Sequence, residues 1–458
     1  MIFIKSNKLF GTDGIRGTSN IFPMTADIAL KLGQACGKYF SNNNYNGNKK
    51  IKVIIGKDTR VSGYIFEYAL TSGLCSMGVD VYLVGPMPTP AIAHLVRSFN
   101  ADFGIVISAS HNPAKDNGIK FFDNLGYKLS DEIEEKIESM VFSNNFDTSN
   151  ISINKVGKAF RIDDAAGRYI EFAKNSINNQ SLKGLKIVLD CANGAAYKVA
   201  PLIFRELRAE VIVFANKPDG FNINEECGSL NPKNVIASVL AEKADIGICL
   251  DGDADRVILV DDKGEIVDGD DILALCAVDL KEKNELVNNK VVATVMSNLG
   301  FEEFLKNNNI EVLRTKVGDR YVIEEMKNSN IVLGGEQSGH IIFKNYNTTG
   351  DGTIATLKIL SILINSNKKF SKLRKKIEKY PQILSSFNVV KKTPIKKLNS
   401  YNEILKFEKE IKNGRVLIRY SGTENKCRVM VEGKEKKNVE KVTNKISNLI
   451  KEEIGVKK

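Results

Sequence analysis

The sequence has little of several residue types that mark particular classes of protein. The 458 residues include no tryptophan, 10 prolines and 3 histidines, and the seven cysteines form no Cys-x-x-Cys pair. Cysteines that are odd in number and widely spaced exclude a small disulfide framework and indicate reduced, mostly buried thiols. No stretch approaches the roughly 20 apolar residues of a membrane span, and the first apolar run is too short for a signal peptide. We therefore expect a cytoplasmic protein with no membrane partner.

The composition that remains is that of a globular protein with a modest positive charge. Hydrophobic residues make up 43% and charged residues 26%, which excludes a disordered or collagen-like chain. The net charge is +11, but the excess lysine is scattered through helical patterns instead of forming the clustered stripe of a nucleic-acid site. The densest run, Lys368–Lys379, has apolar residues at helical spacing and predicts an amphipathic helix with a solvated face. We expect no nucleic-acid partner, and the charge suits a small anionic substrate.

A threefold pattern of strands and loops predicts the fold class. Three β-branched runs each open a segment that continues as a polar loop and a helical pattern: Ile51–Ile55, Leu185–Leu189 and Val291–Val295. Roughly 40 to 60 residues after each, a second apolar run ends in a polar loop, a spacing that suggests a repeated unit. Near-continuous apolar strands alternating with helices predict α/β layers with largely parallel sheets, which bind ligands at the carboxyl ends of their strands.

The last part of the chain has a different pattern. Strands are predicted over Ile383–Val390, Arg415–Ile418 and Arg428–Glu432, followed by a helix with apolar residues on one face. A run of strands closed by a helix predicts a small α+β domain. The polar stretch Lys372–Pro381 is the expected boundary.

Three aspartates follow one of the predicted buried strands. Asp251, Asp253 and Asp255 alternate along the chain, so an extended loop places them on one side, where they repel unless a cation lies between them. Hard oxygen ligands suit Mg²⁺ or Ca²⁺. An EF-hand is excluded, because Arg256 stands where that loop needs glycine. A dehalogenase-type aspartyl nucleophile and a solvated acidic turn are the alternatives.

A serine and two further loops also carry candidate chemistry. Ser110 follows another buried strand; loop serines usually serve turns, but a serine near Mg²⁺ and cations suits phosphoryl transfer. The stretch Arg419–Asn425 combines a cation, hydroxyls and a glycine, and it predicts either a phosphate cradle or a β-turn. The glycine-rich stretch Phe10–Gly17 predicts a tight loop that presents Arg16, and it does not match a dinucleotide fingerprint.

Together these motifs are similar to those of the α-D-phosphohexomutase superfamily, and most closely to its bacterial phosphoglucosamine mutase branch. The motifs come in the order and spacing of that superfamily: Gly11–Gly17, Ser108–Pro113, Asp251–Arg256, Gly334–His340 and Arg419–Thr423. The branch is indicated by Gln337, Asn222–Asn224 and Val317–Tyr321. The resemblance implies three α/β domains of related topology and a smaller C-terminal α+β domain around a central active-site cleft. The expected domains span residues 1–155, 156–256, 257–372 and 373–458.

The resemblance also implies a reaction and a set of site residues. Glucosamine 6-phosphate would become glucosamine 1-phosphate through phosphorylated Ser110 and a 1,6-bisphosphate, a step that feeds UDP-N-acetylglucosamine and cell-wall precursor synthesis. One Mg²⁺ per chain would be held by the Ser110 phosphate and the three aspartates, and glucosamine or glucose 1,6-bisphosphate would serve as activator. The implied catalytic residues are Ser110, Arg16, Lys120, His111, Arg256 and His340. The implied substrate-binding residues are Glu336, Ser338, Arg419, Ser421, Gly422 and Thr423.

Other functions compete with this interpretation. A phosphomannomutase/phosphoglucomutase would share the chemistry and act on another sugar. A phosphatase would result if water reached the phosphoserine before the sugar did, and a non-catalytic sugar-phosphate-binding protein would need no carrier serine. The only expected partner is a small sugar phosphate, and we expect a monomer or a homodimer.

Overall fold

The computed structural model describes residues 8–11, 13–42, 50–144, 146, 148, 151–374, 377–421 and 425–456. The chain forms two compact units. Unit 1 comprises residues 1–295 and 313–374, and unit 2 comprises residues 296–312 and 375–458. Within the described part of the chain, no helix has both the length and the apolar character needed to cross a bilayer.

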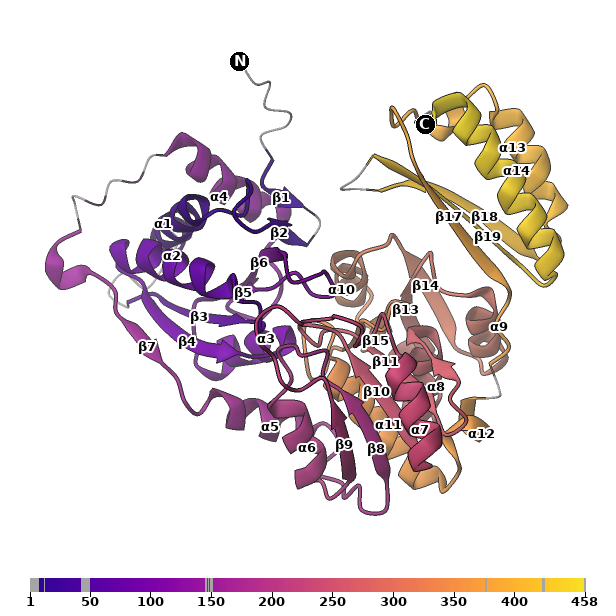
Figure 1. Cartoon of the computed structure of the whole chain (residues 1–458), viewed down its shortest axis with the longest axis horizontal. Helices are drawn as coiled ribbons and strands as arrows, with labels where there is room; N and C mark the ends of the chain where they lie inside the picture. The colour runs from indigo at the N-terminus through magenta and orange to yellow at the C-terminus, as the bar shows by residue number, and fades with distance from the viewer. Residues whose placement is uncertain are drawn as a thin grey trace. The chain divides into compact units, whose positions relative to one another are not determined.

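Unit 1 begins with a seven-stranded sheet in the order β1-β2-β6-β5-β3-β4-β7 (Figure 1). Its strands are β1 (Phe10–Gly11), β2 (Gly14–Thr18), β3 (Lys52–Lys57), β4 (Asp80–Pro86), β5 (Phe103–Ile107), β6 (Asp116–Asp123) and β7 (Ala159–Arg161). The helices of this part are α1 (Ala26–Asn42), α2 (Gly63–Ser76), α3 (Thr89–Ser98) and α4 (Asp131–Ser143), with η1 (Ile153–Lys155) preceding β7. Strands β3, β4, β5 and β7 pair in parallel, and β2 and β6 are antiparallel to their neighbours.

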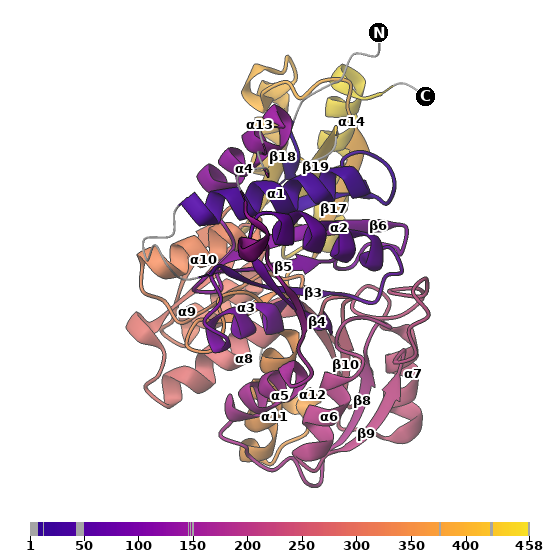
Figure 2. The ribbon, with the colours of Figure 1, turned by 90° about the vertical axis from the view of Figure 1, so that its left-hand side faces the viewer.

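Helices cover both faces of this first sheet. On one face, α1, α2 and α4 contribute Leu32, Leu70 and Ile137 to a core built on alternating strand residues such as Val53 and Ile105. Figure 2 shows α1 and α2 lying side by side there. On the other face α3 approaches so closely that a Cβ at Gly56 would lie 2.4 Å from Ile92. The close packing of α3 thus requires glycine in the strand.

The second sheet of unit 1 has the order β12-β11-β10-β8-β9. Its strands are β8 (Lys186–Asp190), β9 (Glu210–Phe214), β10 (Ile246–Leu250), β11 (Val257–Asp261) and β12 (Ile266–Val267). The accompanying helices are α5 (Ala165–Asn175), α6 (Val199–Glu206) and α7 (Lys233–Glu242). Val235 and Val239 of α7 pack on Val188, Cys249 and Val260 of the sheet, which buries the face that the apolar strands require.

The third sheet has the order β14-β13-β15-β16. Its strands are β13 (Lys290–Thr294), β14 (Glu311–Thr315), β15 (Leu333–Gly335) and β16 (Ile341–Phe343). The helices are α8 (Gly269–Glu282), α10 (Asp319–Asn328), α11 (Gly352–Ser366) and α12 (Phe370–Arg374), and η2 (Val287–Asn289) precedes β13. A capping box between Asp268 and Asp271 starts α8: the side chain of each aspartate accepts the backbone N–H of the other.

The three sheets share one local topology, which confirms the predicted relation between the α/β units. In each sheet a strand in the parallel part of the sheet ends in a polar loop, and the chain returns as an antiparallel neighbour: β5 to β6, β10 to β11 and β15 to β16. The loops are residues 108–115, 251–256 and 336–340. They lie at the carboxyl ends of the strands, as predicted; the antiparallel return strands are an addition to the largely parallel sheets expected from the sequence.

Unit 2 is a small α+β structure, also as predicted. Its antiparallel sheet has the order β17-β19-β18, with β17 (Gln382–Asn388), β18 (Gly414–Tyr420) and β19 (Lys426–Gly433). The helices are α9 (Leu299–Asn307), α13 (Tyr401–Glu410) and α14 (Lys436–Ile454), with η3 (Ile395–Lys397) before α13. Val439, Val442 and Ile446 of α14 pack on Val429 and Val431 of β19. Figure 1 shows α13 and α14 side by side over one face of the sheet.

The helix predicted over Lys368–Lys379 is wrong in its second half. Helix α12 ends at Arg374, and residues 377–380 are not helical. Tyr380 instead exchanges two hydrogen bonds of 2.9 Å with the Asn298 side chain. Pro381 follows and disfavours the helical conformation at the residue before it. The prediction for cysteine is confirmed, because all seven are free thiols and six are buried.

Candidate active site

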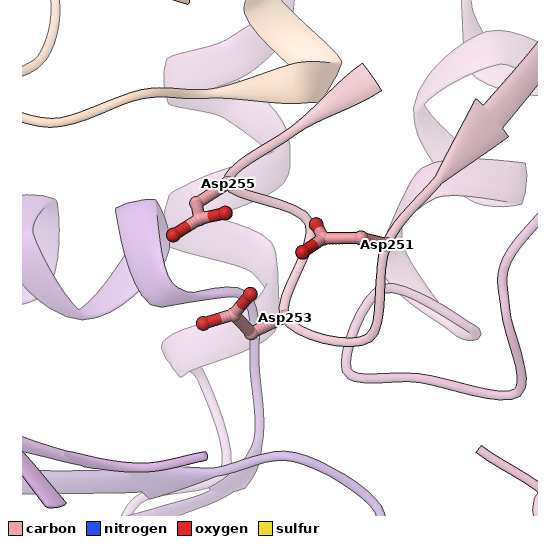
Figure 3. A group of neighbouring side chains, drawn as sticks. All are labelled: Asp251, Asp253 and Asp255. Atoms are coloured by element: carbon pink, nitrogen blue, oxygen red, sulfur yellow. The ribbon is translucent and has the colours of Figure 1, made fainter. Parts of the chain in front are cut away.

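Asp251, Asp253 and Asp255 form a compact acidic group in the loop between β10 and β11. One carboxylate oxygen from each lies within 4.8 Å of the others, and all three residues are buried. Figure 3 shows the three carboxylates directed toward a common space. The backbone of Ala254 is left-handed, with φ of 56°, and this tight turn brings the alternating side chains to one side.

The three carboxylates differ in how they are held. Ser110 Oγ donates to Oδ2 of Asp251 at 2.5 Å, and the backbone N–H of Arg256 donates to its Oδ1 at 3.1 Å. Burial, followed by the neighbouring Asp255 and Asp253, raises the pKa of Asp251 well above its usual value. Burial also raises the pKa of Asp253, but the Lys120 ammonium and hydrogen bonds from Lys120 and Thr89 outweigh it, so the net shift is downward.

This acidic group fits a divalent cation. Within the residues that the structure describes, Oδ1 of Asp253 and Oδ1 of Asp255 are buried and receive no hydrogen bond. A buried carboxylate oxygen without a donor is unfavourable unless a cation takes that place. Carboxylate oxygens are the ligands that Mg²⁺ prefers, and Ser110 Oγ adds a fourth oxygen to the same space. The group can therefore hold a metal ion.

Ser110 is placed beside the acidic group by a strained, well-supported loop. It is only 1% exposed, and its φ of 51° is left-handed, which is uncommon for serine. Its N–H donates to Ser108 Oγ at 2.9 Å. His111 Nδ1 lies 3.4 Å from Ser110 Oγ and 3.2 Å from a guanidinium nitrogen of Arg256. Burial, followed by Arg256 and Arg16, lowers the pKa of His111 to about 4, so its imidazole is neutral at neutral pH.

Two residues without an expected role hold this serine loop. Arg60 is fully buried, pairs with Asp58, and donates to the carbonyl oxygens of Ser110 and Asn112 at 3.1 and 2.5 Å. Asn224 donates to the same two carbonyls at 2.9 and 3.1 Å. The sequence marked Asn224 only as part of a subfamily motif, and Arg60, which lies beyond the predicted strand Ile51–Ile55, carried no signal.

Cationic side chains face the acidic group. Lys120 lies 2.9 Å from Asp253 and 3.5 Å from Asp255. Burial lowers the pKa of Lys120, but the surrounding carboxylates outweigh that effect and raise it, so the side chain is an ammonium at neutral pH. Arg16 donates to the carbonyl of Ala109 at 3.2 Å and pairs with Asp13. Arg16, Lys120 and Arg256, each expected at a reacting group, are therefore gathered around the serine and the acidic loop.

The loop after β15 joins the same site. Arg256 and His340 form a β-bridge, and Val257 N–H donates to the carbonyl of Gly339 at 3.1 Å. His340 is buried, and its Nε2 accepts the N–H of Gly350 at 3.2 Å. Glu336 is half-buried and accepts from Gly318 N–H at 3.1 Å, while Ser338 is exposed.

The expected phosphate loop belongs to unit 2. Arg419 lies on β18, and Ser421 follows it as a buried residue. The N–H of Ser421 donates to the carbonyl of Lys426 at 2.9 Å, and Lys392 donates to the carbonyl of Ser421 at 2.7 Å. Gly422 and Thr423 lie outside the described residues.

Comparison with known families covers nearly the whole chain. Four models of the phosphoglucomutase/phosphomannomutase family match in order: the alpha/beta/alpha domain I over residues 7–148, domain II over 167–264, domain III over 268–380 and the C-terminal domain over 374–449. A phosphoglucosamine mutase from Nitratidesulfovibrio vulgaris (Miyazaki F) is 51% identical over 450 residues, which cover 98% of this chain and 99% of the relative. One from Protochlamydia amoebophila is 51% identical over 452 residues and 98% of both chains.

Solved structures show the same fold at lower identity. A phosphoglucomutase/phosphomannomutase family protein from Burkholderia thailandensis matches with a TM-score of 0.81 and 23% identity, over 98% of this chain and 100% of its own. The Aspergillus fumigatus N-acetylphosphoglucosamine mutase, solved with GlcNAc-6P and magnesium, matches with a TM-score of 0.67 and 16% identity, over 97% and 96%. From the ordered matches to all four domains and the full-length similarity, the chain belongs to the phosphoglucomutase/phosphomannomutase family of the α-D-phosphohexomutase superfamily.

Proposed function

We propose that this protein is a phosphoglucosamine mutase, which interconverts glucosamine 6-phosphate and glucosamine 1-phosphate through phosphorylated Ser110. The observation that carries the proposal is the contact of 2.5 Å between Ser110 Oγ and Asp251, inside a buried acidic group faced by cations. A hydroxyl held there is suited to carry a phosphoryl group, because a covalent carrier divides one difficult transfer into two. Relatives that are 51% identical over nearly their full length carry this name.

In the first transfer the phosphoryl group leaves Ser110. The bond between phosphorus and Ser110 Oγ breaks, a bond forms to the O1 oxygen of glucosamine 6-phosphate, and the proton of that sugar hydroxyl ends on Ser110 Oγ. Arg16, Lys120 and Arg256 balance the charge that spreads over the phosphoryl oxygens. His340 lies beside Arg256 through a β-bridge, and His111 remains neutral beside the serine. Lys120 acts as a cation in this state.

In the second transfer the bisphosphate is reversed in the site. The bond between phosphorus and O6 breaks and a bond forms to Ser110 Oγ, the Ser110 hydroxyl proton passes to O6, and glucosamine 1-phosphate is released. Arg419, Ser421, Gly422 and Thr423 would hold whichever phosphate is not reacting. Glu336 and Ser338 would bind the sugar hydroxyls. A site that accepts both ends of the same sugar favours a mobile phosphate-binding domain.

The reaction as proposed requires Mg²⁺. Asp251, Asp253, Asp255 and the phosphate on Ser110 would hold one ion per chain, and the bound ion supplies Lewis-acid stabilisation of charge on the phosphoryl oxygens. The buried Oδ1 atoms of Asp253 and Asp255, which accept no hydrogen bond in the described part of the chain, support this assignment. Glucosamine or glucose 1,6-bisphosphate would activate an enzyme that has lost its phosphate.

The remaining expectations form part of the proposal. We place domain boundaries at residues 1–155, 156–256, 257–372 and 373–458. We propose a monomer or homodimer acting in the cytoplasm on a small sugar phosphate, without a nucleic-acid or membrane partner. The free thiols support the cytoplasmic assignment, since an oxidising compartment favours disulfides.

The test is a comparison of three substrates in a coupled assay with Mg²⁺ and a bisphosphate activator. Glucosamine 6-phosphate, glucose 6-phosphate and mannose 6-phosphate are compared by kcat/KM. We expect glucosamine 6-phosphate to be preferred. A preference for glucose or mannose phosphate would assign the protein to the phosphomannomutase/phosphoglucomutase group instead. Release of inorganic phosphate without a 1-phosphate product would indicate a phosphatase.

A further inference from the structure

Lys128 lies between two segments of unit 1, the loop that joins β1 to β2 and the start of α10. It follows β6, and its side chain is 11% exposed. The ammonium forms ion pairs with two carboxylates, Oδ1 of Asp13 in the loop between β1 and β2, and Oδ2 of Asp319 at the first residue of α10. A lysine buried between two carboxylates holds them in one geometry, since without it they would face and repel each other.

Asp13 connects Lys128 to the cations of the site. Its Oδ1 is taken by Lys128, while its Oδ2 pairs with Arg16 and lies 3.4 Å from the Lys120 ammonium. The two oxygens of one carboxylate therefore divide their charge between different partners. Lys128 limits how strongly Asp13 attracts Arg16 and Lys120, and so it affects where these two cations point.

Asp319 connects Lys128 to the loop after β15. Its Oδ2 lies 3.6 Å from His340 Nε2. The preceding residue, Gly318, donates its N–H to Glu336 Oε1 at 3.1 Å. The start of α10 thus touches the two residues of that loop to which the proposed function gives phosphate and sugar contacts, His340 and Glu336.

We propose that Lys128 is a positioning residue for phosphoryl transfer, which fixes Asp13 and Asp319 and through them the orientation of Arg16 and Lys120 and the place of His340. This inference rests on the proposed function. Lys128 touches neither the serine nor the acidic group, so it acts through its neighbours. The Val317–Tyr321 motif indicates the subfamily without giving its residues a role, and the ion pair with Lys128 supplies a role for Asp319.

The neighbouring Arg320 provides a matched control. Its guanidinium pairs with Glu134 at 2.9 Å and with Asp131, and it donates to the carbonyl of Leu129 at 3.2 Å. It therefore joins α10 to the segment after β6 just as Lys128 does, but it does not pair with Asp13. Loss of either residue removes an ion pair across the same contact, but of the two only Lys128 is a direct ion-pair partner of Asp13. Arg320 feels the charge of Asp13 without contacting it.

The experiment compares Lys128→Met with Arg320→Met in the full chain. Both variants are expected to melt at a lower temperature than the wild type. Lys128→Met is expected to lower kcat by about ten- to a hundred-fold, because small displacements of catalytic groups have effects of that size. Its KM should change by less than about three-fold, and kcat of Arg320→Met should stay within about two-fold of wild type. Lys128→Arg, which keeps the charge, should recover part of the lost kcat.

Two results would overturn the inference. One is a Lys128→Met protein that folds and keeps kcat within about two-fold of wild type. The other is an equal loss of kcat in Arg320→Met, which would make the contact merely structural. If Lys128→Met does not fold, the double variant Lys128→Met/Asp319→Asn is measured in its place by the same criteria. The second change removes the repulsion between the two carboxylates. An inactive wild type would contradict the proposed function and is recognised before any variant is measured.

Discussion

Ser110 Oγ donates to Oδ2 of Asp251 at 2.5 Å, although the two residues are 141 positions apart in the sequence. The contact joins the loop after β5 of the first sheet to the loop after β10 of the second. A Cβ at Gly252 would lie 2.5 Å from the Ser110 carbonyl, so a glycine beside Asp251 is what allows the loops to meet so closely. The site therefore depends on the approach of two loops from separate sheets.

Replacement of the serine tests the covalent step. Ser110→Ala should lower mutase turnover by at least about a thousand-fold, as the loss of a nucleophile generally does. Binding of glucosamine 6-phosphate, measured by calorimetry, should largely survive, because the proposed sugar and phosphate contacts remain. Ser108→Ala is the control in the same loop, and it should still become phosphorylated. Substantial turnover by Ser110→Ala would exclude the phosphoserine mechanism.

Removal of one carboxylate tests the metal site. Because burial and its neighbours raise the pKa of Asp251, its ionised form is unfavourable in the metal-free protein. Asp251→Asn should therefore raise Tm without metal, while the wild type and the control variant, but not Asp251→Asn, should gain Tm on adding Mg²⁺. Asp190→Asn is the control, since Asp190 is buried on β8, the strand that pairs with β10, and accepts two backbone N–H groups outside the acidic group. A Mg²⁺-dependent rise in Tm that persists in Asp251→Asn would argue against this ion site.

Replacement of Arg60, the buried arginine that holds the serine loop, should affect both stability and activity. Arg60→Met leaves the buried Asp58 without its partner and should lower the free energy of unfolding by about 3–5 kcal/mol. Adding Asp58→Asn removes the uncompensated charge and should restore part of that stability. Turnover should stay low in both variants, because the carbonyls of Ser110 and Asn112 lose the same donor. Recovery of turnover together with stability would show that Arg60 matters only for folding.

The buried environment of His94 predicts that the stability of the protein depends on pH. Its ring stacks on Phe172 with centroids 3.8 Å apart, and burial, followed by Arg97 and Arg168, lowers its pKa from 6.5 to about 4. Between these values the unfolded chain binds more protons than the folded one, so stability rises with pH and is lost as the pH falls from 6.5 toward 4. His94→Phe should therefore lose less Tm than the wild type over this interval. An equal pH slope for the two proteins would contradict the assignment.

The architecture could be predicted from the sequence because the patterns that indicate strands, loops and helices are local. Apolar strands such as Ile246–Leu250, followed by polar loops, indicated where the sheets end and where ligands bind. The spacing of Asp251, Asp253 and Asp255 indicated a cation site for the same reason. The helix expected over Lys368–Lys379 was too long because periodicity alone does not register a partner such as Asn298, which holds Tyr380 in a non-helical backbone.

The supporting residues of the site could not be predicted because their partners are distant in sequence. Arg60 contacts carbonyls 50 and 52 residues away, and Lys128 contacts Asp319 across 191 residues. A lone arginine or lysine outside a recognised motif looks like an ordinary surface residue. Only the three-dimensional approach of the loops shows that these two charges are enclosed and shared among the active-site groups.

Transfer of a label from the protein to the sugar tests the central claim most directly. Protein carrying radiolabelled phosphate on Ser110 is mixed with unlabelled glucosamine 6-phosphate in a single turnover, and the products are separated. The account predicts that the label leaves the protein and appears on carbon 1 of glucosamine 1-phosphate, while unlabelled phosphate from carbon 6 replaces it on Ser110. Label that remains on the protein while product forms, or that is released only as inorganic phosphate, would contradict the account.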